Sequence, residues 1–201
     1  MPRVSKAQTD SNRVAIEEAS SRLFREQGVK NVSVADLMAE VGLTHGGFYG
    51  HFESKDALAA VACTVAFKQA AARWHQRVGG HSSRTAALNA LFEGYLSAQS
   101  RNSVGSGCPL AALATDVARE PVDKPIHNAY LDGVNSLLNV LLPLQNTGNA
   151  DTDRSQSLVQ LSTVVGAMVL ARATQGDAIS DELLAAARAH LVAATSTPFQ
   201  S

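Results

Sequence analysis

Residues 33–52 read SVADLMAEVGLTHGGFYGHF, two short helical segments joined by a tight turn at Gly42. The first segment begins with Ser33 and Asp36 at the spacing of a capping box, in which Ser33 is the N-cap. Thr44 carries a hydroxyl that can cap the second segment. This order of helix, turn and helix predicts a helix-turn-helix, a motif whose second helix lies in the major groove when it binds DNA.

The motif combines a small apolar core, to which both segments contribute, with an exposed face of unusual composition on the second segment. The expected core residues are Ala35, Leu37, Met38, Leu43 and Phe48. The expected exposed residues are Thr44, His45, Gly46, Gly47, Tyr49 and His51. Each glycine costs about 1 kcal/mol of helix stability relative to alanine, which favours a role in the close approach of the backbone to another surface. A helical hairpin without a DNA role is the alternative at this point.

Helices are expected throughout the rest of the chain. The sequence contains 33 alanines, the strongest helix formers, and lacks the alternating β-branched runs of strands. We therefore predict an all-α protein of about nine helices. They are expected over 12–27, 33–41, 44–52, 55–78, 85–101, 109–119, 124–144, 154–175 and 180–195. The boundary near residue 53 separates a three-helix N-terminal domain, 1–53, from a larger helical domain, 54–201.

The composition argues against several classes of protein. The 201 residues include two cysteines and are 45% hydrophobic, which disfavours a disulfide scaffold and intrinsic disorder. No run approaches the roughly 18 apolar residues of a membrane span, and Met1–Asp10 lacks the apolar core of a signal peptide. We therefore expect a cytoplasmic protein with reduced thiols. Residues 1–60 carry seven Lys or Arg against eight Asp or Glu, so a nucleic-acid partner must be argued from local geometry.

A longer pattern surrounds the helix-turn-helix. Its residues are Ile16, Ala19, Leu23, Phe24, Gly28, Ser33, Leu37, Met38, Gly42, Thr44, Gly46, Phe48, Tyr49, His51, Phe52, Ser54, Lys55 and Leu58. With this pattern, residues 14–58 resemble the DNA-binding domain of the TetR/AcrR family of bacterial repressors. The departures are mild: Ser33 stands where the family has Thr, Leu37-Met38 where it has Ile-Ala, and Thr44 where it has Ser. The resemblance covers about a quarter of the chain.

The resemblance implies binding to a double-stranded DNA operator. The DNA-binding residues that it implies are Ser33, Thr44, His45, Gly46, Gly47, Tyr49, His51 and Lys55. Hydroxyl and amine groups at these positions would contact phosphates, and His45 is the candidate for reading a base edge, because the next two residues are glycines. We also expect Arg3, Lys6 and Arg13 to form a mobile basic arm that reaches phosphate or the minor groove.

The family also implies a homodimer that forms through the last two long helices. The expected interface residues are Leu158, Leu161, Val165, Leu184, Ala187 and Leu191. These positions form helical stripes, and the helix over 154–175 is apolar on nearly all sides, so it must be buried. Either the helices of a second subunit or the chain's own core can provide this burial.

A pocket for a small-molecule effector inside the C-terminal domain is a further implication of the family. The expected pocket residues are Phe67, Trp74, Phe92, Tyr95, Leu96, Leu113, Tyr130 and Met168. They are mostly apolar with a few hydrogen-bonding groups, which is typical of a ligand pocket and equally of an ordinary core. An apolar or aromatic small molecule is the default effector.

Cys108 follows a glycine-rich turn and precedes Pro109, which favours the first helical position, so Cys108 is the expected N-cap. A helix N-terminus stabilises a thiolate and lowers the pKa of a thiol. The segment Gly107–Leu113 also resembles a G-C-x-L stretch in one branch of the family, where some members respond to electrophiles or oxidants. Cys108 is therefore either a thiol sensor or a small buried residue, and Cys63 is expected in the core.

The residues favour regulation over catalysis. No Ser/His/Asp order, phosphate-binding loop or carboxylate pair predicts an enzyme, and the histidines and cysteines lack the spacing of metal ligands, so neither a metal nor a cofactor is expected. The leading hypothesis is a homodimeric repressor that a small-molecule effector releases from a palindromic operator. The alternatives are a repressor that senses oxidants through Cys108 and a helical protein-interaction module that does not bind DNA.

Overall fold

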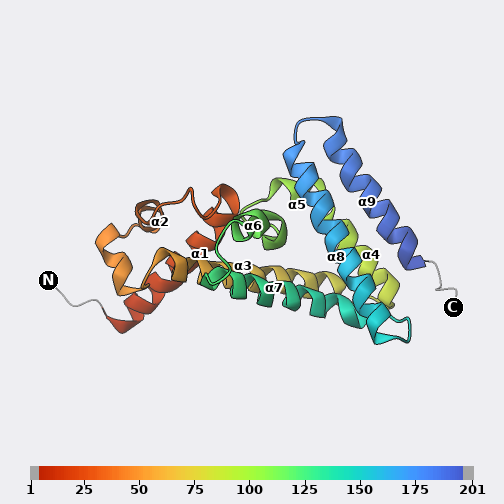
Figure 1. The fold of residues 1–201 in the computed structure, drawn as a ribbon, viewed down its shortest axis with the longest axis horizontal. Helices are drawn as coiled ribbons and strands as arrows, with labels where there is room; N and C mark the ends of the chain where they lie inside the picture. Colours follow the sequence, from red (N-terminus) through yellow and green to blue (C-terminus); the bar gives the residue numbers. More distant parts are fainter. Residues whose placement is uncertain (1–4, 197–201) are drawn as a thin grey trace.

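A computed structural model describes residues 5–196, and every regular element in that range is a helix, as predicted. The elements are α1 (Lys6–Gln27), α2 (Val34–Glu40), the 3-10 helix η1 (His45–Gly50), α3 (Lys55–Val78), α4 (Arg84–Tyr95), α5 (Ala98–Asn102), α6 (Pro109–Ala118), α7 (Pro125–Leu141), the 3-10 helix η2 (Leu142–Leu144), α8 (Ala150–Ala173) and α9 (Ala178–Ser196). Figure 1 shows α1 and α2 at one end of the molecule and α8 and α9 at the other, with α3 and α7 between them. Among the helices so described, none has the length and apolar character to cross a bilayer.

Local capping sets the limits of the N-terminal helices. Ser5 accepts a hydrogen bond from the backbone N–H of Gln8, so α1 begins at Lys6 instead of near residue 12. The helix ends at Gly28, whose φ of 86° lies in the left-handed region that glycine favours. The predicted capping box of α2 is present, with both of its reciprocal hydrogen bonds.

The small core beneath the helix-turn-helix differs from the prediction in two respects. Leu37, Met38 and Phe48 are buried as expected. Ala35 is exposed, because a helix as short as α2 buries only the stripe that faces its neighbours. The second helix of the motif is a 3-10 helix over His45–Gly50, and its glycines explain this, since they weaken a regular α-helix.

Helices α3 and α7 lie side by side along much of their length (Figure 1). They approach most closely around Gly133, where an added Cβ would lie 2.2 Å from the Phe67 ring. The Phe67 ring packs edge-on against Tyr130, with 5.4 Å between the ring centroids. Because α3 begins at Lys55, directly after the helix-turn-helix, this packing fixes the direction in which α3 leaves the N-terminal part of the chain.

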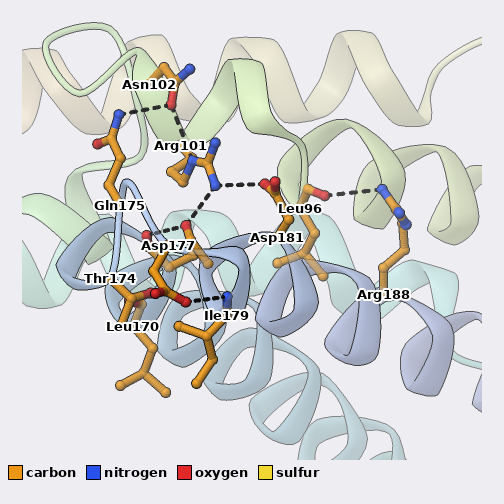
Figure 2. A network of polar contacts seen from close by, with 12 residues as sticks. Leu96, Arg101, Asn102, Leu170, Thr174, Gln175, Asp177, Ile179, Asp181 and Arg188 are labelled. Carbon is orange, nitrogen blue, oxygen red and sulfur yellow. Dashed lines mark hydrogen bonds and ion pairs between the residues drawn. The ribbon is translucent and has the colours of Figure 1, made fainter.

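Helices α8 and α9 form an antiparallel pair, and α4 packs against α9 (Figure 1). Arg101 of α5 ties the neighbouring segment to this pair: it donates to Ser180 Oγ at 2.6 Å and pairs with Asp181 at 2.7 Å (Figure 2). Arg188 of α9 donates to the Leu96 carbonyl at 3.3 Å (Figure 2). The junction between α4 and α5 is therefore fixed to α9.

This junction is also where the prediction of one helix over 85–101 fails. The chain breaks at Leu96, and Ser97 caps the new helix α5 by accepting a hydrogen bond from the Ser100 N–H. Because of the break, α5 and the loop after it turn away from the axis of α4 and form one wall of a cavity.

Candidate functional site

The 3-10 helix η1 carries an aromatic pair at the surface. Its exposed residues, with the preceding N-cap, are Thr44, His45, Gly46, Gly47, Tyr49 and Gly50. The Thr44 hydroxyl makes no capping hydrogen bond, and His51, which was expected to be exposed, is half-buried. Phe48 is fully buried and contacts the Tyr49 ring edge-on, with 5.3 Å between centroids. Tyr49 is 65% exposed and lies edge-on to the His45 ring at 6.4 Å. The buried Phe48 thus holds Tyr49 and His45 in a defined position on the outside of the motif.

Ser33 is exposed, but its side chain already has a partner within α2. Its hydroxyl donates to Asp36 Oδ2 at 2.6 Å and accepts from the Asp36 N–H at 3.1 Å. Hydrogen bonds from Ser33 hold the pKa of the Asp36 carboxyl below its usual range. A carboxylate therefore lies directly beside the position at which a phosphate contact is expected.

The expected basic arm is not an arm within the described residues. Lys6 and Arg13 both belong to α1, and Arg3 lies outside the described residues. Arg13 lies over the Phe52 ring, with Cζ 4.5 Å from the centroid, and donates to the His51 carbonyl at 2.7 Å. Arg13 therefore fixes the end of η1, a role that the sequence pattern did not reveal because the two segments are far apart in the chain.

Lys55 is half-buried at the junction between the helix-turn-helix and the rest of the chain. Burial lowers the pKa of its amine, and the carboxylates of Asp56, Asp36 and Glu120 act in the opposite direction. Other contacts across this junction join the Val29 N–H to Asp116 (3.0 Å), Lys30 to Glu120 (2.9 Å), and Lys124 to Asp56. Lys55 thus lies among charges of its own chain.

A cavity of about 190 Å³ lies among α3, α4, α5, α8 and the loop before α6. Of the expected pocket residues, Trp74, Tyr95 and Met168 line it, and Cys108 lines it as well. The remaining expected pocket residues pack elsewhere in the core, and they are Phe67, Tyr130, Phe92, Leu96 and Leu113. The structure therefore brings together only part of the predicted set.

Three arginines that the sequence pattern did not single out also line this cavity, which we call the arginine cavity. Arg73 and Arg77 come from α3, and Arg172 comes from α8. Arg172 donates to the carbonyls of Ser100 and Arg101, each at 3.2 Å. Arg172 lies about a hundred residues after the other two, and each arginine resembles an ordinary surface charge on its own helix. The spacing of residues in the sequence therefore does not predict that the three come together.

One backbone carbonyl connects the arginine cavity to α1, the helix that precedes the helix-turn-helix. Gly107 O accepts from Arg73 at 3.2 Å and from Arg25 of α1 at 2.9 Å. Arg25 is buried and also donates to Gln69 Oε1 at 3.0 Å. Burial, followed by the charge of Arg73, lowers the pKa of Arg25 to about 10.

Cys108 is the N-cap of α6, as predicted, but its thiol is not acidified. The side chain makes no capping hydrogen bond, and burial raises the pKa of the thiol. The neighbouring Tyr95 hydroxyl and the charge of Arg172 act in the opposite direction without reversing the shift. Desolvation outweighs the helix N-terminus here. Cys63 is buried, as expected.

Three of the expected interface residues lie in the chain's own core. Leu161, Leu184 and Leu191 are buried. Leu158 is exposed, and Val165 and Ala187 are half-buried. The apolar residues that α8 and the start of α9 leave exposed are Leu158, Val159, Val169, Leu170 and Ile179. The periodic spacing of apolar residues in the sequence does not distinguish the helix face that packs on the chain's own core from the face that remains exposed.

The fold and the exposed η1 define a protein with an N-terminal helix-turn-helix followed by a larger helical domain. Residues 16–62 match the family described as bacterial regulatory proteins, tetR family. This segment belongs to the TetR family, and the whole chain has the fold of TetR-family regulators.

Similar proteins support both parts of this assignment. An HTH-type transcriptional regulator of Staphylococcus aureus (strain USA300) is 43% identical over 47 residues, which is 23% of this chain and 25% of that protein. The match thus spans about a quarter of the length of the curated relatives. A TetR-family regulator from Cytophaga hutchinsonii has a TM-score of 0.78 at 22% identity, with 96% of this chain and 98% of that chain covered. The reduced form of NemR from E. coli has a TM-score of 0.76 at 19% identity, with 90% and 95% covered.

Proposed function

We propose that the protein is a cytoplasmic, homodimeric transcriptional repressor that binds a palindromic operator and releases it when a small-molecule effector binds. In this proposal residues 1–53 are the DNA-binding domain and residues 54–201 bind the effector and form the dimer. The observation that carries the proposal is the exposed pair of Tyr49 and His45, which buried Phe48 holds on a helix-turn-helix. Hydroxyl and imidazole groups of this kind contact phosphates and base edges.

An open apolar face on α8 supports the dimer. Leu158 and Leu170 are 41% and 53% exposed, and an added Cβ at Gly166 would meet no atom within 4 Å. A second copy of α8 and α9 can cover this face, with Gly166 allowing close approach. Dimers of helix-turn-helix proteins read half-sites about 34–36 Å apart, so a dimer implies a palindromic operator.

The route from effector to DNA runs through the contacts of Gly107. Its carbonyl joins Arg73 at the cavity to Arg25 on α1. An effector that binds more tightly when these contacts are rearranged shifts the population toward a state in which the two helix-turn-helix motifs no longer match the half-sites. The ion pair between Lys30 and Glu120 and the hydrogen bond from the Val29 N–H to Asp116 form a second connection between the two parts of the chain.

DNA selection from a random duplex library tests the proposal. We expect the purified full chain to enrich a palindrome, and Tyr49→Phe to weaken binding to that palindrome. Asp132→Asn, an exposed change on α7, is the control that should leave binding unchanged. A well-folded protein that enriches no palindrome at low salt would reject the regulator and favour the protein-interaction module.

The same assay with a mild thiol oxidant separates the thiol mechanism from the effector mechanism. If Cys108 is a sensor, the oxidant abolishes operator binding in the wild type and leaves Cys108→Ser unaffected. Because burial raises the pKa of this thiol, we expect operator binding to persist in both proteins. Loss of binding in the wild type alone would assign the switch to Cys108.

A further inference from the structure

The arginine cavity concentrates positive charge where the structure places no opposing charge. Arg73, Arg77 and Arg172 line it, and its lining includes no Asp or Glu. None of the three forms an ion pair within residues 5–196. Arg25 adds a fourth guanidinium at the Gly107 carbonyl. The three arginines are half-buried, and charges that are withdrawn from water are normally paired, so this arrangement favours an anionic partner that the described chain does not supply.

Two buried polar groups at the cavity lack an oxygen acceptor. Arg172 Nη1 makes no hydrogen bond within the described residues. The Tyr95 side chain is 3% exposed, and its hydroxyl has only the Cys108 thiol, a weak hydrogen-bond partner, beside it. An unsatisfied buried donor costs about 1–3 kcal/mol, and a ligand oxygen in the cavity would accept from both groups.

We propose that the arginine cavity binds the oxyanion of a small organic acid, with Arg172, Arg77 and the Tyr95 hydroxyl as its donors. The proposal rests on the proposed function only in identifying this acid as the effector. Guanidinium groups present several donors in a fixed plane and recognise carboxylates through paired hydrogen bonds. The acid replaces the purely apolar effector that the sequence suggested.

The other residues that line the cavity indicate the polarity and the size of the rest of the ligand. Trp74, Met168 and Ala70 give the cavity an apolar side, so the oxyanion carries a small apolar or aromatic group. The volume of about 190 Å³ lies below the roughly 300–1,000 Å³ of pockets for drug-sized ligands. An acid with a single ring or a short chain fits a site of this size.

Burial supports the need for an anion. It lowers the pKa of Arg73, Arg77 and Arg172, because desolvation disfavours their charged forms. A bound oxyanion offsets this cost for all three groups together. Arg172 also donates to the α5 backbone at Ser100 and Arg101, and the Arg101 side chain holds α9 (Figure 2). The ligand would therefore contact the segment that is fixed to the expected dimer helices.

Trp74 provides a direct assay, because it is the only tryptophan in the sequence and it lines the cavity. The full chain, dialysed free of multivalent anions, is titrated with benzoate, with its neutral analogue benzamide and with inorganic phosphate while tryptophan fluorescence is recorded. We expect saturable binding of benzoate and none of benzamide. Binding of phosphate without benzoate would keep the oxyanion site and assign it to an inorganic ion.

Arginine variants locate the site. Arg77→Met and Arg172→Met should each weaken benzoate binding by about ten- to hundredfold, the range for a hydrogen bond between charged groups. Arg77 is the safer variant, since its guanidinium makes no hydrogen bond within the described residues and its loss breaks no native contact of that kind. Arg154→Met, an exposed change on the same helix as Arg172, is the control and should bind like the wild type.

Three results would overturn the proposal: equal responses to benzoate and benzamide, no response to either anion at millimolar concentration, or unchanged affinity in Arg77→Met and Arg172→Met. DNA selection with ligand-free protein is scored separately. A palindrome without anion binding would reject the oxyanion site and keep the regulator. Anion binding without a palindrome would keep the site and reject the regulator.

Discussion

Gly133 is a position where the fold leaves no room for a single added methyl group. An ideal Cβ there would lie 2.2 Å from both Cγ and Cδ2 of Phe67, whereas carbon atoms pack best at about 3.5–4.0 Å. Gly133→Ala therefore forces α3 and α7 apart, or moves the Phe67 ring, by more than about 1 Å. The ring has little freedom, because it is buried and packs edge-on against Tyr130.

The expected magnitude follows from two opposing effects. Alanine improves the intrinsic stability of helix α7 by about 1 kcal/mol relative to glycine. Overpacking a buried contact costs about 1–3 kcal/mol, and more where the backbone must move. Since the overlap with Phe67 is deep, we expect a net loss of about 2 kcal/mol of unfolding free energy for Gly133→Ala.

Urea unfolding of the full chain, at one fixed protein concentration, measures this loss and its cause. In the double variant Gly133→Ala/Phe67→Leu, the smaller side chain should relieve the clash, which gives a coupling energy of about 1–3 kcal/mol between the two sites. Wild-type stability in Gly133→Ala would refute the close approach of α3 and α7 at this point. So would a double variant whose loss of unfolding free energy equals the sum of the two single losses within about 0.5 kcal/mol.

Two further changes test electrostatics and the DNA interface. Burial raises the pKa of the Cys63 thiol from 9.0 to about 12, so its contribution to stability is present below pH 9 and is lost as the pH rises toward 12. Urea unfolding under reducing conditions should show that the wild type loses about 2 kcal/mol more than Cys63→Ala between roughly pH 8 and 10.5, and equal losses would contradict a buried neutral thiol. Arg13→Met removes the hydrogen bond to the His51 carbonyl and the ion pair with Glu17, and keeps apolar contact with Phe52. It should cost about 1 kcal/mol and weaken operator binding in a fluorescence anisotropy titration. Glu18→Gln, an exposed change on the same helix, is the control, and unchanged binding in Arg13→Met would remove Arg13 from the interface.

The helix-turn-helix was predictable because its determinants are local. Ser33 and Asp36, which are three residues apart, determine where α2 begins, and both hydrogen bonds of their capping box are present. The turn at Gly42 has a φ of 70°, which glycine adopts without strain. What the local pattern missed was the helix type of η1 and the contact from Arg13, which lies 38 residues before its partner His51.

The arginine cavity was not predictable for the opposite reason. Arg73 and Arg172 meet only after α3 and α8 have packed, and nothing in either helix distinguishes these residues from ordinary surface arginines. Aromatic residues in the sequence do indicate where a cavity can form, since Trp74 and Tyr95 line this one. They do not indicate its charge. Apolar residues such as Phe67, whose expected role was in the pocket, instead serve the packing of α3 on α7.

Gly107 joins the arginine cavity to α1, the helix before the helix-turn-helix, so we expect a ligand in the cavity to affect both. An added Cβ at Gly107 would lie 2.6 Å from Arg172 Nη2 and 2.7 Å from the Ser103 carbonyl, so Arg172 packs directly against this residue. The carbonyl of the same residue accepts hydrogen bonds from Arg73 and from Arg25 of α1. An oxyanion bound in the cavity attracts the Arg73 guanidinium and therefore competes with that carbonyl for it. In the proposed function, a resulting shift of the loop would change the hydrogen bond between Arg25 and the Gly107 carbonyl. An effector that favours the shifted loop would then change the position of α1 through this one backbone group.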